Sequence, residues 1–354
     1  MNIFQKGLKD VVAVHTKIAS VDGEKGELRY RGELVDKILP NSTFEQLSTY
    51  LWTGKKEPVS PLIVKGRILP QHVVNLLEVL PNELQVMDAV KTAISVFGTP
   101  EFLGKSKYEQ SVLLTAALPV IVATYYRKQK GLDPLESRND LGHTANFLYL
   151  LTGNSPTPAQ VEALETYLLL TMEHGLNAST FAARVTISTE SDIPSAIVSA
   201  LGTMKGPLHG GAPSGVLDLL DEMETPDQVR EVIERKLAKG ERIMGFGHRI
   251  YKTEDPRSIL LREKCLALQG EDTWLDLATF AEKEIIELLN ERKPGRRLYT
   301  NVEFYAAAIM RSIDLDPTLF TPTFSMARMV GWTAHAMEQA EDNTIFRPQS
   351  IYIG

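Results

Sequence analysis

The stretch TPAQVEALETYLLLTMEHG, residues 157–175, has the pattern of a complete amphipathic helix. A capping hydroxyl at Thr157 precedes Pro158, the first-turn position that accepts proline, and Gly175 can end the helix. Between these ends, apolar residues recur at helical spacing, at Val161, Leu164, Leu168 and Met172. The stretch therefore predicts a helix that buries one face.

The same pattern repeats along the chain. Thr225-Pro226 opens a run that Gly240 can close, with Val229, Val232, Ile233 and Leu237 on one face. Residues 277–289 carry Leu277, Phe280, Ala281, Leu288 and Leu289 at helical spacing. Another helix begins at Ser42 or Thr43, with Gln46 at the capping-box offset from Thr43 and Gly54 at its end. The mostly apolar run 113–126 predicts a buried helix.

Strand signals are confined to residues 18–30, where Asp22-Gly23 and Lys25-Gly26 favour a small hairpin. No alternation of strands with helices is present to build a nucleotide-binding parallel sheet. We therefore predict an all-α fold. Glycine and proline cluster at 202–215, 293–295 and 317–322, and bracket a segment of the size of a smaller domain.

Composition excludes several classes of protein. The 354 residues suffice for roughly two domains, and 43% hydrophobic with 23% charged residues is ordinary for a globular protein. The run 113–126 contains Pro119 and falls short of the roughly 20 residues that span a bilayer, so we expect no membrane segment. A net charge of −7 argues against a nucleic-acid partner. With no secretory signal and a single cysteine, Cys265, we expect a reducing cytoplasm.

Two histidines lie among glycines, in GPLHGG at 206–211 and GFGHRIYK at 245–252. The segment NVEFY at 301–305 adds a carboxylate. Two imidazoles and one carboxylate are the groups needed to remove a proton from carbon while stabilising an enolate. His174 also stands at the end of a predicted helix, whereas His15, His72, His143 and His335 favour surface or core roles.

Arg257, Arg328 and Arg347 can bind carboxylates through bidentate contacts, and together they suit a dicarboxylate if the fold brings them together. Taken singly, each is as readily explained as a surface charge or an ion pair. A metal site is not predicted, because no close ligand pair such as His-x-x-x-His is present.

Several motifs in one order give the chain a likeness to a known family. Residues 18–32, residues 173–185, both histidine motifs and residues 347–354 resemble citrate synthase in its shorter bacterial and archaeal form, which includes 2-methylcitrate synthase. The resemblance implies an α-helical homodimer with a large domain (1–211 and 319–354) and a small domain (212–318). It also implies condensation of acetyl-CoA with oxaloacetate and hydrolysis of citryl-CoA, without a cofactor, since the coenzyme A thioester is a substrate.

The resemblance further implies a role for each residue. His209 donates a hydrogen bond to the thioester oxygen, His248 polarises the oxaloacetate carbonyl, and Glu303 removes the methyl proton. Oxaloacetate would contact His174, Arg257 and Arg328, with Arg347 supplied across the dimer interface. Coenzyme A would lie near Arg242, Gly245, Gly247, Lys252 and Arg296, with Lys293 and Arg297 close by.

The match departs from the family in one position that matters for chemistry. Glu303 stands where the family usually has aspartate, and the extra methylene moves the carboxylate by about one bond length. Three hypotheses remain open: an active citrate synthase, an enzyme preferring propionyl-CoA that makes 2-methylcitrate, and a catalytically weak paralogue that binds the same ligands.

Overall fold

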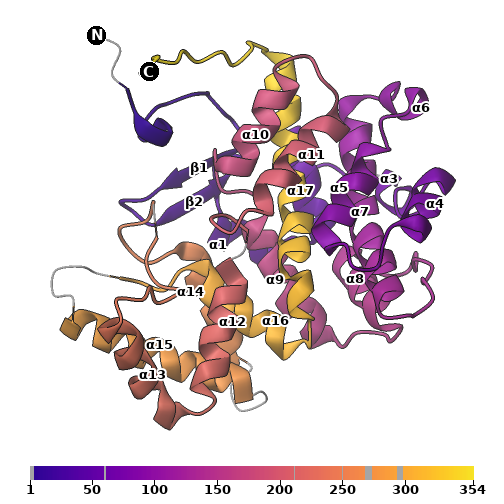
Figure 1. The fold of residues 1–354 in the computed structure, drawn as a ribbon. Coiled ribbons are helices and arrows are strands. Elements are labelled where there is room, and N and C mark those ends of the chain that lie inside the picture. Colours follow the sequence, from indigo (N-terminus) through magenta and orange to yellow (C-terminus); the bar gives the residue numbers. More distant parts are fainter. Residues whose placement is uncertain (1–3, 60, 211, 249, 268–272, 293–297) are drawn as a thin grey trace.

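The computed structural model describes residues 4–59, 61–210, 212–248, 250–267, 273–292 and 298–354, and helices dominate them (Figure 1). Near the N-terminus lie the strands β1 (Ala19–Asp22), β2 (Glu27–Tyr30) and β3 (Glu33–Leu34) and the short 3-10 helices η1 (Lys6–Leu8) and η2 (Leu39–Asn41); η3 (Pro317–Leu319) precedes the last helix. The α-helices of the first half are α1 (Val35–Ile38), α2 (Phe44–Thr53), α3 (Leu62–Lys65), α4 (Gln71–Val79), α5 (Val86–Ser95), α6 (Pro100–Leu103), α7 (Lys107–Gln129), α8 (His143–Thr152) and α9 (Pro158–Thr171). They are followed by α10 (Ala178–Ile187), α11 (Ile193–Met204), α12 (Ala212–Met223), α13 (Pro226–Ala238), α14 (Pro256–Ala267), α15 (Thr273–Arg292), α16 (Val302–Ser312) and α17 (Phe320–Glu341). The all-α prediction is confirmed.

The predicted hairpin is also confirmed. Strands β1 and β2 pair antiparallel with Ala19 opposite Tyr30, and the short β3 extends the sheet in a way the sequence did not indicate. Helix α2 begins after Thr43, whose side chain and that of Gln46 form the predicted capping box. Gly54 ends it in the left-handed region with φ 72°.

Helix α9 begins where the sequence predicts, but it ends earlier than predicted. Thr157 caps its first turn together with Gln160, but the helix stops at Thr171, four residues before Gly175. The buried hydroxyl of Tyr30, on strand β2, lies 3.1–3.2 Å from the carbonyl oxygens of Leu169, Leu170 and Glu173. It therefore provides a hydrogen-bond donor at the end of the helix. Residues 172–177 therefore form a turn that leads into α10 and carries His174.

The later helices follow the predicted spacing with two corrections. Helix α13 starts at Pro226, and Gly240 follows its end with φ 72°, but the side chain of Thr225 makes no capping hydrogen bond. Helix α15 covers the predicted 277–289 run, but Phe280 is 42% exposed and does not belong to the buried face. Its neighbours Leu277 and Ala281 are buried.

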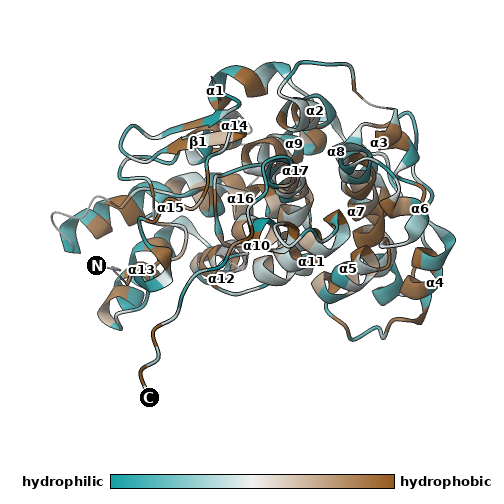
Figure 2. Cartoon of the chain, turned by 90° about the horizontal axis from the view of Figure 1, so that it is seen from above, coloured by the Kyte–Doolittle hydropathy of each residue, from teal (hydrophilic) through white to brown (hydrophobic). Residues whose placement is uncertain are grey.

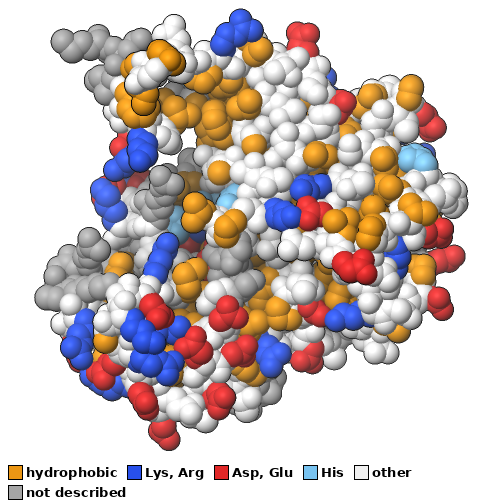
Figure 3. All heavy atoms as spheres, in the orientation of Figure 1, with side chains coloured by type: hydrophobic (Ala, Val, Ile, Leu, Met, Phe, Trp, Pro, Cys, Tyr) orange, Lys and Arg blue, Asp and Glu red, His pale blue; other side chains and the backbone are white. Residues whose placement is uncertain are grey.

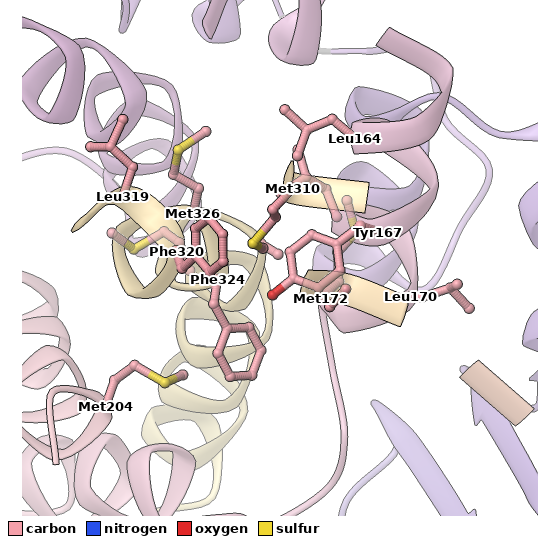
Figure 4. Packing of buried hydrophobic residues seen from close by; sticks show 14 of the residues in the cluster. Leu164, Tyr167, Leu170, Met172, Met204, Met310, Leu319, Phe320, Phe324 and Met326 are labelled. Atoms are coloured by element: carbon pink, nitrogen blue, oxygen red, sulfur yellow. The ribbon is translucent and has the colours of Figure 1, made fainter. Parts of the chain in front are cut away.

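Two long helices form the centre of the molecule. Helix α7 includes the predicted run 113–126, contains Pro119, and is hydrophobic along most of its length (Figure 2). Helix α17 packs on α7, α9, α10 and α11. Figure 4 shows aromatic and sulfur-containing side chains of α9, α16 and α17 packed together, among them Tyr167, Met310 and Phe324. Because α7 and α17 are each covered by several other helices, they are expected to be apolar around their whole circumference.

Helices α12 to α16 pack on one another in a separate region of the molecule, the lower left of Figure 1. This region contacts the remainder chiefly through α9 and α17. Among the residues that the structure covers, no helix has the length and apolar character needed to cross a bilayer.

Candidate active site

The segments that carry His248 and Glu303 run side by side, although 55 residues separate them. Phe246 forms an isolated antiparallel bridge with Thr300. The amide of Gly247 donates to Tyr299 O at 2.7 Å, and the amide of Asn301 donates to the Gly245 carbonyl at 2.9 Å. This pairing brings the two predicted motifs together.

Both glycines of this pairing have positive φ, 86° at Gly245 and 83° at Gly247. A Cβ at Gly245 would lie 2.9 Å from the ring of Phe304. Glycine at this position is therefore explained by backbone geometry and close packing. The side-chain amide of Asn301 donates a hydrogen bond to the Gly247 carbonyl. Its Oδ1 accepts the backbone amide of Glu303 and so caps α16.

The His248 ring is held in one tautomer. Its Nδ1 accepts the backbone amides of Ile250 and Tyr251, both at 3.0 Å, so the ring hydrogen of the neutral form is on Nε2. Nη2 of Arg257 lies 3.3 Å from the same Nε2. Both groups are donors, and an oxygen of a bound molecule is the acceptor that could satisfy both. Burial is the main cause that lowers the pKa of His248, to about 4.

His174 lies next to His248. Their ring centroids are 5.6 Å apart, and Nε2 of His174 is 3.1 Å from the hydroxyl of Tyr251. His174 is buried, and this burial, together with Arg257 and Arg328, holds its pKa well below the usual value. The imidazole is therefore neutral at physiological pH.

His209 follows α11 and faces the first turn of α10. Its Nε2 lies 2.8 Å from the hydroxyl of Ser179, which also accepts the indole N–H of Trp332 at 2.9 Å. The single hydrogen of the Ser179 hydroxyl can go to His209 Nε2 or to Asn177 Oδ1, each at 2.8 Å. When it goes to His209, Nδ1 carries the ring hydrogen and is free to donate to a ligand. Burial lowers the pKa of His209 to about 4.

Glu303 occupies the first turn of α16 and is partly buried. Burial raises its pKa to about 7, although Arg257 and Arg328 act in the opposite direction. The carboxylate is therefore a stronger base than an ordinary glutamate. Neutral imidazoles beside a basic carboxylate are suited to removing a proton from a weak carbon acid.

Two buried arginines face the same site. Arg257, at the start of α14, binds Asp255 through Nε and Nη2 at 3.0 and 2.8 Å. Arg328, on α17, donates from Nε to the Thr171 carbonyl at 3.0 Å, while its buried Nη1 has no hydrogen-bond partner among the described residues. An unpartnered buried donor is costly unless a ligand satisfies it.

Among the described residues, three others predicted for the site, Arg347, Lys252 and Arg242, have exposed side chains and no contact with this cluster. Arg347 is exposed on the C-terminal tail, residues 342–354, which leaves the body of the molecule without helix or strand (Figure 2). There it lines a cavity of about 1320 Å³ between the N-terminal segment and the end of α17. Lys252 is exposed and forms an ion pair with Glu24. Arg242 is exposed, and Arg296, Lys293 and Arg297 lie outside the described residues.

Sequence reasoning missed three residues that shape the site: Ser179 beside His209, Tyr251 beside His174, and Asp255 beside Arg257. Asp255 and Tyr251 lie within three residues of predicted site residues, and that nearness was the only signal available. In Figure 3 histidine atoms are visible in the hollow between the two regions of the molecule.

Comparison with known proteins identifies the family. The family described as "Citrate synthase, C-terminal domain" matches residues 7–349. The chain belongs to the citrate synthase family. It is 37% identical to citrate synthase from Synechocystis sp. over 99% of this chain and 91% of that protein. It is also 37% identical to 2-methylcitrate synthase from Mycobacterium tuberculosis, over 99% of this chain and 90% of that protein.

Solved structures of citrate synthases have the same fold. A crystal structure from Thermotoga maritima has a TM-score of 0.89 and 35% identity and covers 99% of this chain and 96% of that chain. The ternary complex of citrate synthase from Thermoplasma acidophilum with carboxymethyl coenzyme A and oxaloacetate has a TM-score of 0.91 and 27% identity, with coverage of 100% and 97%. As a member of the citrate synthase family, the protein is a transferase of the acyl-condensing type.

Proposed function

We propose that the protein condenses acetyl-CoA with oxaloacetate and hydrolyses citryl-CoA to citrate and coenzyme A. The observation that supports the proposal is that the same two buried arginines influence the pKa values of all the other groups: Arg257 acts on His174, His248 and Glu303, and Arg328 acts on His174, His209 and Glu303. An acid and a base whose environments change their pKa values in opposite directions are typical of an active site.

In the proposed first step, the Glu303 carboxylate takes a proton from the methyl group of acetyl-CoA. The electrons of the broken C–H bond move to the thioester oxygen, which accepts a hydrogen bond from His209. The change in basicity from 4.5 to about 7 makes this proton transfer more favourable by about 3 kcal/mol. Stabilisation of the enolate oxygen by a fixed neutral donor supplies a further part of the rate.

In the second step, the enolate carbon attacks the keto carbon of oxaloacetate and forms the new C–C bond. His248 donates from Nε2 to the keto oxygen, which gains negative charge as the bond forms and takes up a proton to become the hydroxyl group of citryl-CoA; this uptake balances the proton that Glu303 removed. Water then attacks the thioester carbon, the C–S bond breaks, and the products are a carboxylate, the thiol of coenzyme A and one proton. We assign oxaloacetate to His174, Arg257 and Arg328, because they present buried donors to the same place.

We assign coenzyme A to the region of Arg242, Gly245, Gly247, Lys252 and Arg296, as the resemblance implies. The backbone of Gly245 and Gly247, which lies beside His248, supports this assignment.

We further propose a homodimer in which Arg347 completes the partner's site. Its support is that Arg347 lies on an exposed tail beside large apolar side chains, with Ile351, Tyr352 and Ile353 at least 70% exposed. We also propose that residues 212–318 form a small domain that closes over the substrates, and that the protein works in the cytoplasm.

Subunit complementation tests the homodimer. The variants Glu303→Gln and Arg347→Ala should each be inactive alone. Unfolding and refolding an equimolar mixture should restore about a quarter of wild-type activity, because half of the dimers are mixed and each has one intact site. Absence of any recovery, with mixed dimers demonstrated, would show that Arg347 does not act across an interface.

A second candidate is 2-methylcitrate synthesis from propionyl-CoA. It is favoured by the 2-methylcitrate synthase relative, which is as similar to the chain as the Synechocystis citrate synthase. One methylene in a pocket changes discrimination by only about 1–3 kcal/mol, so both substrates must be measured.

Thiol release from acetyl-CoA and propionyl-CoA with oxaloacetate, on the wild type and on Glu303→Asp, separates the possibilities. A higher kcat/KM for acetyl-CoA supports the proposal, and a higher value for propionyl-CoA supports the second candidate. A wild type that is inactive with both, but active as Glu303→Asp, would instead identify a ligand-binding paralogue.

A further inference from the structure

Asp255 is a buried carboxylate that the proposed reaction does not use. It directly precedes Pro256, the first residue of α14, and its Oδ1 accepts the backbone amide of Arg257 at 3.0 Å. Its carbonyl oxygen accepts the amide of Ile259 at 3.1 Å. These contacts are typical of a helix cap, and a cap uses one side-chain oxygen. Capping of α14 therefore leaves the second oxygen, Oδ2, for another role.

The second oxygen of Asp255 joins two groups of the candidate active site. It accepts Nη2 of Arg257 at 2.8 Å and the backbone amide of Val302 at 3.3 Å. Val302 is the first residue of α16 and stands immediately before Glu303. One oxygen thus contacts both the guanidinium assigned to oxaloacetate and the helix that carries the proposed base.

The start of α16 is held by two side chains. The first amides of a helix have no partners within the helix. The carboxylate of Asp255 accepts the first amide of α16, and the side chain of Asn301 accepts the second. Asn301 also binds the carbonyl of the residue before His248. Glu303 is therefore held relative to His248 by one side chain and relative to Arg257 by the other.

The contacts of Asp255 are shielded from water. The exposed fractions are 1% for Asp255, 4% for Arg257 and 2% for Val302. Hydrogen bonds between ionised groups are short and strong, and a buried donor that loses its partner is costly. The nitrogen that Asp255 holds, Nη2, is also the one that lies 3.3 Å from Nε2 of His248. A shift of the guanidinium would therefore change the place where both donors can meet one substrate oxygen.

We propose that Asp255 is a positioning residue that sets the spacing between Arg257, which binds oxaloacetate, and Glu303, which takes the proton from acetyl-CoA. The inference rests on the proposed function, from which it takes the roles of these two residues. Asp255 acts through them and does not itself contact a substrate. The reaction is sensitive to this spacing, because reacting atoms must approach to about 3–3.5 Å.

The variant Asp255→Asn separates positioning from capping. Asparagine caps helices as well as aspartate does, so its oxygen can keep the amide of Arg257. Its NH2 group then replaces Oδ2 and faces two other donors, Nη2 of Arg257 and the amide of Val302, so both of these bonds are lost. Loss of a negative charge would by itself favour binding of the oxaloacetate dianion. Weaker binding would therefore indicate a displaced guanidinium.

We expect the dissociation constant for oxaloacetate, measured by calorimetry without acetyl-CoA, to rise about tenfold or more in Asp255→Asn. At saturating concentrations of both substrates the kcat should also fall about tenfold or more, because the base is displaced. The KM for acetyl-CoA should change less than about twofold. A purely structural role would lower the fraction of binding-competent protein, measured as the calorimetric stoichiometry, without changing the dissociation constant.

The matched control is Asp316→Asn. Asp316 also precedes a proline and accepts the amide two residues further on, that of Thr318, at 3.0 Å. It forms an ion pair with Lys130 at 3.0 Å, away from the groups of the candidate site. The control should leave both oxaloacetate binding and kcat unchanged.

A second variant, Asp255→Glu, keeps the charge beside Arg257 but moves the carboxylate by about one bond length. If only the charge mattered, this variant would equal the wild type. Positioning instead predicts weaker oxaloacetate binding and a lower kcat.

An unchanged dissociation constant or an unchanged kcat in folded Asp255→Asn overturns the inference, because the inference requires both effects. If Asp255→Asn does not fold, wild-type values in Asp255→Glu have the same consequence. The two proposals fail in different ways: a wild type without turnover contradicts the proposed function, whereas the inference fails when the wild type is active and the variants equal it.

Discussion

The raised pKa of Glu303 predicts an unusual pH profile. The base must be deprotonated to act, so kcat/KM should fall with decreasing pH through about 7. At pH 5.5 a group with that pKa is only about 3% deprotonated, whereas a glutamate of ordinary pKa 4.5 is about 90% deprotonated. The structure thus predicts a decrease of about 30-fold from the plateau at pH 5.5, where an ordinary glutamate would give almost none.

The assay should follow the loss of the thioester directly, because the rate at which reagents react with the released thiol itself depends on pH. His209 and His248, with pKa values of about 4, remain neutral between pH 5.5 and 9 and should not add a second step in this range. Glu165→Gln, a change in a partly buried glutamate of α9 that accepts the amide of Phe44, is the control and should keep the wild-type profile. A plateau that extends unchanged down to pH 5.5 would refute the conclusion that burial controls the basicity of Glu303.

Three further predictions follow from single contacts. Ser179→Ala removes the hydroxyl that can donate to Nε2 of His209 and so keep the ring hydrogen on Nδ1. The variant should lower kcat about 10- to 100-fold with little change in the KM for oxaloacetate, and a kcat equal to that of the wild type would contradict this role. Gly23→Ala would place a Cβ 2.2 Å from the carbonyl oxygen of Ile250, in the loop that follows His248, so kcat/KM should fall about tenfold or more. A fully active variant would show that this contact does not position the loop. Burial lowers the pKa of His143 from 6.5 to about 3, so the unfolded chain binds more protons at this residue than the folded chain does. Between pH 6 and pH 4 the free energy of unfolding in urea should therefore fall less steeply in His143→Gln than in the wild type, by about 1.4 kcal/mol for each pH unit, and equal slopes would contradict the lowered pKa.

Features that depend on neighbours in sequence were predicted correctly. The capping box of Thr43 with Gln46 and the capping hydroxyl of Thr157 were both predicted, and both helices begin where these residues indicate; the part that Gln160 plays in a second capping box was not predicted. The end of α9 depends on Tyr30, about 140 residues away, and local patterns carry no information about such a contact. Nor could they show the third strand of the sheet.

The same distinction, between features that local sequence predicts and features that distant contacts determine, applies to the candidate site. Its imidazoles and carboxylate were recognisable from glycine-rich motifs and family likeness, but the bridge between Phe246 and Thr300 that brings them together is a property of the folded chain. The same holds for His335, which looked unremarkable within a helix. Its contact with Glu173 joins α17 to the turn at residues 172–177, and only the packing of α17 brings Nε2 of His335 to 3.2 Å from Oε1 of Glu173.

Helix α17 joins the two ends of the chain. The indole of Trp52 donates to the Thr333 hydroxyl at 2.9 Å, and the amide of Lys17 donates to Glu338 at 2.8 Å, across 281 and 321 residues. Contacts of this sequence separation form late and slow folding, because the intervening chain must first be brought together. During synthesis, the helices made earlier lack their central partner until residues 320–341 have left the ribosome, and their apolar faces stay accessible to chaperones until then.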